Sequence, residues 1–116
     1  MESSKENYAK AWEYEWFMTK VYGNSITHKT KVHLTNLKNV LDIESGLTNS
    51  KHLGSHEKQF NKVKNYISKA LIKVSKTTKY KQDSDLFLIL NDKIDYCDSG
   101  DDLLLIIMRA KKLMNE

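Results

Sequence analysis

Residues 55–76, SHEKQFNKVKNYISKALIKVSK, contain the strongest helical pattern in the chain. Five apolar side chains recur there at intervals of three and four residues, the spacing that places them on one face of an α-helix. We call these five the apolar seam: Phe60, Val63, Ile67, Ala70 and Val74. Leu71 lies beside the seam, Ser55 is the expected N-cap, and Glu57 stands in the first turn, where its charge suits the helix dipole. The stretch therefore predicts an amphipathic helix that buries the seam in the core.

Another side of the same predicted helix is basic. Five lysines lie roughly 145° from the apolar seam at about 100° per residue, and we call them the lysine face: Lys58, Lys62, Lys69, Lys73 and Lys76. No carboxylate follows Glu57 until Asp83, so no acidic side chain one turn further along neutralises these lysines. Lys64, Lys79 and Lys81 stand at the margin of the face. Such a run of one charge either solvates the outer side of a helix or forms a binding surface for phosphate groups or an acidic protein.

Charge is unevenly distributed along the 116 residues, whose formal net charge is +4. Residues 1–49 carry six lysines and six carboxylates, residues 50–82 carry nine lysines and one glutamate, and residues 83–116 carry four cations and eight carboxylates. The net charges are thus 0, +8 and −4, which sum to +4. The acidic last third could pair with the lysine face inside the fold, which would leave less of that face for a partner.

Composition favours a single domain that spans residues 1–116 and is large enough to bury an apolar core without disulfides or metals. The chain has no proline, and Cys97 is its only cysteine, so no intramolecular disulfide can form. The N-terminus lacks the apolar run of a signal peptide, and the longest strictly apolar run, residues 103–108, is too short to cross a bilayer. We therefore expect a cytoplasmic protein that has no membrane partner.

The N-terminal segment allows two interpretations of its backbone. Ser3 and Glu6 have the spacing of a capping box, and Gly23 is a natural residue to follow a helix that ends at Tyr22. Large apolar side chains also alternate over residues 12–18, which is the pattern of a strand, and Gly23 could then turn a hairpin. We favour the helix and keep the hairpin as the alternative.

Aromatic side chains are concentrated in this segment. Tyr8, Trp12 and Trp16 follow one another at intervals of four residues, so they would share one face of a helix, and we expect that face to anchor the core. Tyr14 and Tyr22 would lie on the flanks of the helix. Because lysines also occur in this segment, these two tyrosines are candidates to stack on nucleic-acid bases.

A further helix is expected over residues 27–44 or 30–44. Its apolar stripe consists of Leu34, Leu37 and Leu41, with Val40 beside them, and Gly46 follows its end. Small and polar side chains in residues 47–54 predict a loop before the amphipathic helix, and residues 77–82 predict a polar connector after it.

The last third of the sequence predicts two more helices. Carboxylates in residues 83–85 suit the first turn of one, although residues 86–90 taken alone fit a buried strand equally well. Ser99 is the expected N-cap of the other, which covers residues 101–114. Residues 103–108 are apolar all round, so we expect this last helix to be central to the core.

The chain displays no motif that carries enzyme chemistry. Residues 95–100 resemble the start of a calcium loop, but Cys97 occupies a position that needs an oxygen ligand. His52 and His56 are four residues apart, yet Phe60 stands where a zinc-protease motif needs a second histidine after Glu57. The isolated glycines build no phosphate-binding loop. We therefore expect no enzyme activity, no metal and no cofactor.

These patterns predict an all-α fold, a compact single-domain bundle of four to five helices, with α+β and an N-terminal hairpin as the alternative. The lysine face predicts a non-catalytic protein that contacts the nucleic-acid backbone, with little base readout because its cations are lysines rather than arginines. The alternative function is a protein–protein interaction module that acts on an acidic partner, such as a phage-type inhibitor, an immunity factor or a helical subunit of a larger assembly. The apolar seam could in that case pair two copies of the chain as a homodimer.

Overall fold

The computed structural model describes residues 2–23, 28–46 and 56–114, and five α-helices lie in those ranges. In chain order these are α1 (Glu2–Tyr22), α2 (His28–Glu44), α3 (His56–Ser75), α4 (Ser84–Ile94) and α5 (Gly100–Leu113), with a short 3-10 helix, η1 (Thr78–Asp83), before α4. The described ranges contain no strand. The all-α prediction is confirmed, and the alternative of an N-terminal hairpin is wrong. The loop predicted for residues 47–54 and the N-cap predicted at Ser55 lie outside the described residues.

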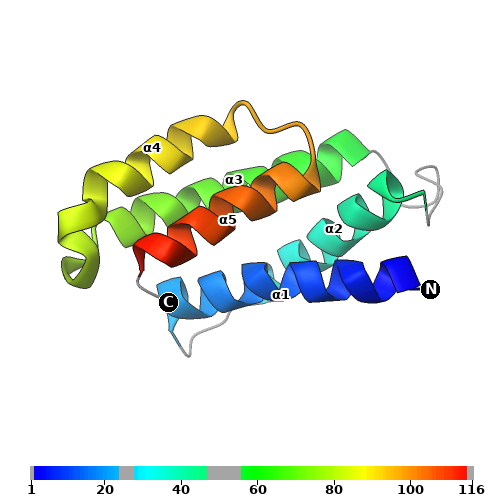
Figure 1. Ribbon diagram of the computed structural model, residues 1–116, viewed down its shortest axis with the longest axis horizontal. Coiled ribbons are helices and arrows are strands. Elements are labelled where there is room, and N and C mark those ends of the chain that lie inside the picture. The colour runs from blue at the N-terminus through cyan, green and yellow to red at the C-terminus, as the bar shows by residue number, and fades with distance from the viewer. Residues whose placement is uncertain (1, 24–27, 47–55, 115–116) are drawn as a thin grey trace.

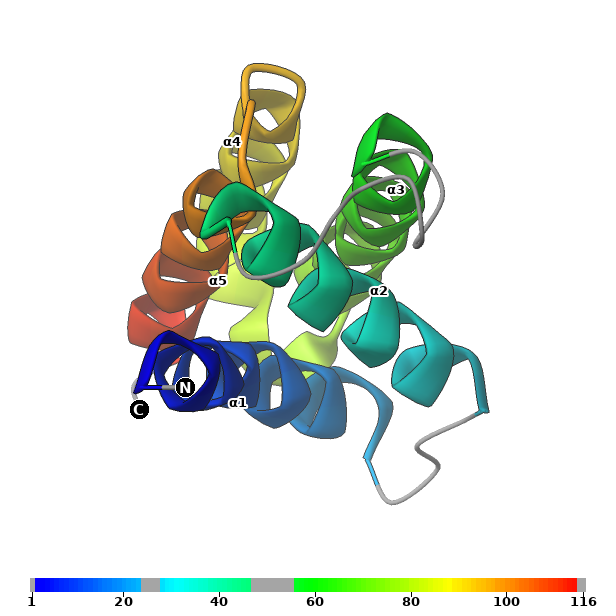
Figure 2. The ribbon, with the colours of Figure 1, turned by 90° about the vertical axis from the view of Figure 1, so that its right-hand side faces the viewer.

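The helices form a closed arrangement around one core. Each helix packs against the next one in the chain, and α5 returns to pack against α1 as well as α2 (Figure 2). In Figure 1, α3, α4 and α5 run beside one another in the upper part of the molecule, and α1 runs below them. The bundle measures 43 × 28 × 23 Å along its principal axes. No helix in the described ranges is long and apolar enough to span a membrane.

Helix α3 confirms the prediction for its apolar seam. Val63, Ile67 and Ala70 have no exposed surface, and Phe60 at one end retains only 7%. The seam faces the interior between α2 and α4, because α3 packs closely against both helices. All the apolar area of the seam is therefore used within one chain. A homodimer through the seam, as proposed from the sequence, would require this core to open.

Helix α1 forms as predicted, but a different face of it is buried. Trp12 is 67% exposed, whereas Tyr14, Phe17 and Met18 have no exposed surface. The expectation that Trp12 and Trp16 anchor the core is therefore wrong for Trp12. Trp16 is half-buried and packs against the core edge, with the ammonium groups of two lysines over its ring at 5.5 and 5.0 Å from the centroid: Lys20 and Lys111. The helix begins at Glu2, so the predicted capping box lies inside it.

The C-terminal end of α2 contacts the first residues of two other helices. Gly46 follows it at φ +75°, as Gly23 follows α1 at φ +66°, and both glycines confirm the predicted helix ends. The Glu44 carboxylate accepts hydrogen bonds from the Gly100 N–H at 2.9 and 3.0 Å and lies 2.6 Å from Nε2 of His56. One carboxylate at the end of α2 thus contacts the first residue of α3 and the first residue of α5, where a negative charge suits the helix dipole.

The N-cap predicted at Ser99 is confirmed, and α5 begins at Gly100, one residue before its predicted start. The Ser99 hydroxyl accepts a hydrogen bond from the Asp102 N–H at 3.1 Å, and the Asp102 carboxylate accepts one from the Asp98 N–H at 3.0 Å. Gly100 leaves room for α2, because a Cβ there would lie 2.8 Å from Cδ2 of Leu41. Along α5 the residues toward the interior are buried, but Leu105 is 53% exposed. The helix is therefore central only on the face that meets α1, α2 and α4.

The segment between α3 and α4 differs from its prediction. The polar connector expected for residues 77–82 is the 3-10 helix η1, whose Tyr80 is buried and packs edge-on against Phe87 with centroids 6.1 Å apart. Helix α4 forms as expected, which excludes the strand alternative for residues 86–90. Only one side of α4 is buried, however, since Leu86 and Ile89 are 46% and 48% exposed.

Candidate functional site

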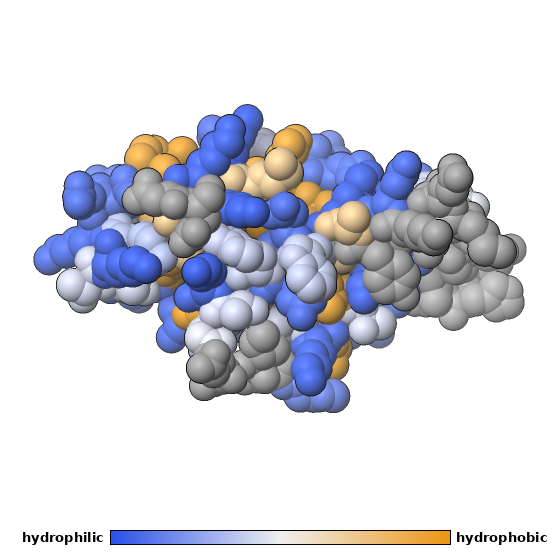
Figure 3. Space-filling model, turned by 60° about the horizontal axis from the view of Figure 1, so that its bottom comes forward, coloured by the Kyte–Doolittle hydropathy of each residue, from blue (hydrophilic) through white to orange (hydrophobic). Residues whose placement is uncertain are grey.

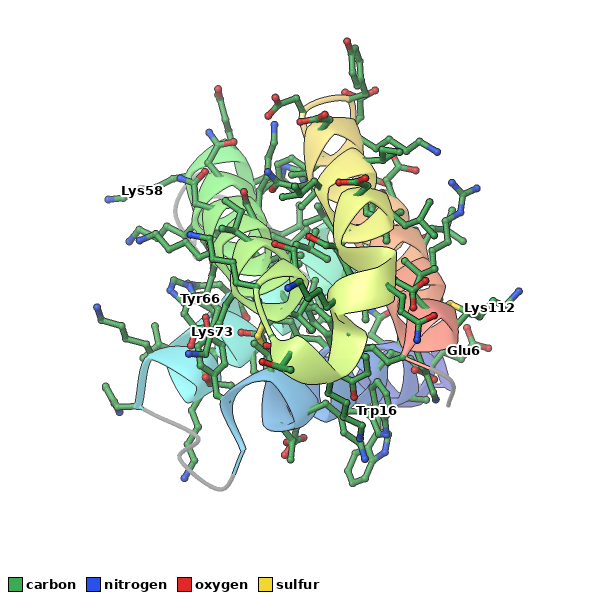
Figure 4. All side chains as sticks on the ribbon, turned by 90° about the vertical axis from the view of Figure 1, so that its left-hand side faces the viewer. Glu6, Trp16, Lys58, Tyr66, Lys73 and Lys112 are labelled. Atoms are coloured by element: carbon green, nitrogen blue, oxygen red, sulfur yellow. The ribbon has the colours of Figure 1, made fainter. Side chains whose placement is uncertain are left out.

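The lysine face lies on the outer side of α3. All five of its members are exposed: Lys58, Lys62, Lys69, Lys73 and Lys76. In Figure 4 the side chains of Lys58, Tyr66 and Lys73 leave α3 on one side and point away from α4. The structure thus keeps the predicted set together on a single accessible surface.

The three marginal lysines do not extend this face equally. Lys64 is half-buried on a different side of α3, close enough to Cys97 to act on its thiol. Burial raises the pKa of Cys97, the Asp102 carboxylate raises it further, and Lys64 partly opposes this rise. Lys79 and Lys81 are exposed on η1, beyond the end of α3, and the Lys79 ammonium lies 5.4 Å from the centroid of the Tyr80 ring. Lys64 therefore leaves the site, while the η1 lysines adjoin its far end.

Among the described residues, no carboxylate of the last third forms an ion pair with Lys62, Lys69, Lys73 or Lys76. The ion pairs that join described residues lie elsewhere: Lys10 with Asp101 at 3.2 Å, Lys111 with Glu13 at 3.3 Å, and His56 with Glu44 at 2.6 Å. None of them uses Lys62, Lys69, Lys73 or Lys76. The expectation that the acidic third could pair internally with this face is therefore not met at these four positions.

Three aromatic rings join α1, α2 and α3 beside the lysines. The rings of Tyr22 and Tyr66 are stacked with their centroids 5.9 Å apart. The imidazole of His33 also packs against the Tyr66 ring, with centroids 4.6 Å apart. The Tyr66 hydroxyl is 2.7 Å from the Thr30 hydroxyl of α2. The Lys73 ammonium lies 5.6 Å from the Tyr22 centroid, a distance typical of a cation–π contact. We call Tyr22, Tyr66 and His33 the aromatic row.

Sequence reasoning found only part of this site. It named Tyr22, which is half-buried next to the lysines, but it missed Tyr66 and His33. A signal was present for Tyr66, because Lys62, Tyr66, Lys69 and Lys73 follow one another at intervals of four, three and four residues. No comparable signal exists for His33, whose neighbour on α3 is 33 positions away in the chain.

Tyr14 was also named as a stacking candidate, and the structure places it in the core. Its ring has no exposed surface, and its hydroxyl donates a hydrogen bond to the Thr30 carbonyl at 3.2 Å. Burial raises the pKa of the Tyr14 hydroxyl well above its usual range, with smaller contributions from Tyr66 and Tyr22. A base cannot reach this ring in the folded chain, so the stacking role does not hold for Tyr14.

Electrostatics tie α2 to the lysine face. Burial lowers the pKa of His33, and the positive charges of Lys62, Lys29 and Lys69 lower it further. Lys29 stands one turn before His33 on α2, while Lys62 and Lys69 come from α3. The positive field of the lysine face therefore extends across the junction between the two helices.

Apolar recesses occur on other surfaces of the bundle. One of about 560 Å³ lies between α1 and α2 and is lined by Trp12 and Leu34, and another of about 290 Å³ lies between α4 and α5. The second is lined by Leu86, Ile89, Leu90 and Leu113 with three cations, Lys93, Arg109 and Lys112. In the space-filling view, apolar side chains appear as separate patches among hydrophilic ones (Figure 3). In the part of the chain that the structure describes, no group of three or more His, Cys, Asp or Glu side chains could hold a metal ion.

Comparison with known proteins assigns no class to this arrangement. No protein-family model matches the chain, and no curated protein or solved structure is significantly similar to it. The site is therefore interpreted from its own geometry and charge.

Proposed function

We propose that the protein binds nucleic acid through its phosphate backbone, with the lysine face of α3 as the contact surface. The observation that carries this proposal is the exposure of five lysines on one side of α3, four of which form no ion pair with a described carboxylate. A surface of one charge sign attracts a polyanion and gains affinity by releasing its counterions. Lys29 supports the proposal, because it adds a cation from α2 to the same field.

Lysine chemistry sets the kind of recognition. Ammonium groups on flexible stems contact phosphate oxygens as point charges, whereas arginine can read base edges with a planar pair of donors. The lysine face contains no arginine. The binding is therefore expected to depend strongly on salt and only weakly on sequence.

The test is the affinity of a labelled oligonucleotide, measured by fluorescence anisotropy over a range of salt concentrations. The triple variant Lys62→Glu, Lys69→Glu, Lys73→Glu is expected to lose at least about tenfold in affinity at low salt and to reduce the slope of log K against log salt by about 2 to 3. The physical reason is that each lost phosphate contact removes close to one released counterion.

A second triple variant provides the matched control. Lys93→Glu, Arg109→Glu, Lys112→Glu changes the formal net charge by the same amount, from +4 to −2, but on the α4–α5 surface. This control is expected to retain more affinity and salt slope than the lysine-face variant. Equal losses in the two variants, with both folded by circular dichroism, would show that net charge rather than this face governs binding.

The α4–α5 recess favours a second candidate function, an interaction with an acidic protein. Leu86 and Ile89 are about half exposed there, and the surrounding cations would suit a partner that combines apolar and acidic side chains. Competition between the oligonucleotide and poly-glutamate separates the two candidates. If the acidic polymer binds and only the α4–α5 variant weakens it, the second candidate is supported.

A further inference from the structure

His33 lies at the point where the positive surfaces of α2 and α3 meet. Its imidazole packs on the Tyr66 ring with centroids 4.6 Å apart and an angle of 32° between the ring planes. Lys29 precedes it by one turn of α2, and Lys62 and Lys69 flank Tyr66 on α3 at distances of four and three residues. One titratable ring thus stands among three cations that two helices contribute.

We propose that His33 is a further phosphate-binding residue of this surface and that it holds a nucleic-acid phosphate as the protonated imidazolium. This inference rests on the proposed function, because it assigns the path of the backbone across the same surface. A phosphate placed among Lys29, Lys62 and Lys69 meets cations from both helices. The backbone would therefore cross from α3 to α2 over the aromatic row.

In the free protein the surroundings of His33 favour the neutral imidazole over the imidazolium. The Asn36 side-chain amide lies 3.4 Å from Nδ1 of His33, so it can donate a hydrogen bond to that nitrogen when the ring proton is on Nε2. Burial of the ring lowers its pKa, and Lys62, Lys29 and Lys69 lower it further. Among the described residues, the groups that act on the imidazole are three lysines, the Tyr66 ring and the Asn36 amide, and none of these carries a negative charge.

A bound phosphate reverses this balance. Its negative charge offsets the three lysines and favours the imidazolium, so binding takes up a proton from solvent at pH values where the ring is neutral in the free protein. The Asn36 amide can then turn to present its oxygen to the new N–H. Linkage fixes the sign: a ligand that raises the pKa of a group binds more tightly as pH falls through the range where that group titrates. Each unit by which the pKa rises strengthens binding by up to about tenfold.

The experiment measures the affinity for a thymine-only oligonucleotide at constant ionic strength from about pH 7.5 to about pH 5.5, either side of the ordinary histidine pKa. The bases and phosphodiesters of this probe do not titrate in that range. Wild type is expected to gain roughly threefold to tenfold in affinity as pH falls. His33→Gln, which keeps a polar side chain that cannot be protonated, is expected to lose most of this gain.

His28→Gln is the matched control. His28 is an exposed histidine at the start of the same helix, so its replacement is expected to leave the pH dependence unchanged. A pH dependence that survives in His33→Gln and disappears in His28→Gln would overturn the proposal. So would an unchanged His33 pKa in proton NMR titrations with and without the oligonucleotide.

Failure of this inference is distinguishable from failure of the proposed function. If wild type binds the oligonucleotide with an affinity that does not vary with pH, only the role of His33 is rejected. If wild type does not bind at low salt at any pH, the nucleic-acid function itself is rejected.

Discussion

The α2–α3 surface, which carries the lysine face and the aromatic row, differs from the α4–α5 surface, which surrounds the recess between those two helices, in how much apolar area it exposes. On α3 every member of the apolar seam is buried, and the exposed side is lined by lysines. On α4 and α5 large aliphatic side chains remain 40–53% exposed, including Leu86, Ile89 and Leu105, and cations are interspersed among them. The first surface can therefore attract a partner only through charge and the edges of its aromatic row, while the second offers apolar area as well.

This difference follows from the position of each helix in the bundle. Helix α3 packs against α2 on one side and α4 on the other, so one stripe of apolar side chains is enough to fill its interior face. Helix α4 packs mainly against α3 and α5, and Phe87, Leu90 and Ile94 already fill that interface. The additional apolar side chains of α4 have no partner helix within the described part of the bundle.

The largest expected effect is on the free energy of unfolding, and it distinguishes a buried isoleucine of α3 from a half-exposed isoleucine of α4. Ile67→Ala removes a side chain with no exposed surface and should lower the free energy of unfolding by about 2–5 kcal/mol, through lost transfer energy and the cavity that remains. Ile89→Ala, at a position that is 48% exposed, should cost less than about 1 kcal/mol. Urea denaturation of both variants measures the difference. Similar losses at the two positions would mean that the α4 surface is covered in solution.

A smaller effect, an increase in stability, is expected when two cations of the lysine face are neutralised. Lys62 and Lys69 each have another lysine one turn away, Lys58 and Lys73, so Lys62→Gln with Lys69→Gln removes two repulsive pairs. Stability at low salt should rise by about 0.4–1 kcal/mol in total, because each like-charge pair costs roughly 0.2–0.5 kcal/mol.

The control for this prediction lies on the α4–α5 surface. Lys93 and Lys112 stand in the last turns of α4 and α5, where a positive charge suits the helix dipole. Neutralising both with glutamine should lower stability by a few tenths of a kcal/mol instead. Thermal unfolding at low and at high salt checks both signs, since added salt should shrink each effect. A stability loss in Lys62→Gln, Lys69→Gln would show that these lysines serve the fold rather than a partner.

The same contrast explains what the sequence could predict. In α3 apolar and charged residues occupy separate sectors, so periodicity alone identified both the buried seam and the lysine face. In α1 large side chains occupy positions on every side, and periodicity could not choose between Trp12 and Tyr14. The neighbouring helices made the choice, and they buried Tyr14, whose hydroxyl reaches the Thr30 carbonyl. The contact between His33 and Tyr66 depends on how α2 and α3 cross, which no local pattern encodes.

The smallest expected effect concerns the pH dependence of folding without nucleic acid, and it tests the field of the α2–α3 surface directly. Burial and the charges of Lys62, Lys29 and Lys69 lower the pKa of His33 in the folded chain, so the unfolded chain binds the proton more readily. The stability that this histidine contributes is complete above its unfolded pKa and is lost as pH falls toward its lower folded pKa. His33→Gln should therefore flatten the decrease in urea midpoint between about pH 7 and about pH 5.5, whereas His28→Gln should not. Bound oligonucleotide should reverse the sign in wild type, since a phosphate among the lysines makes the folded chain the better proton acceptor. A steeper decrease in His33→Gln than in wild type would contradict a positive field at this position.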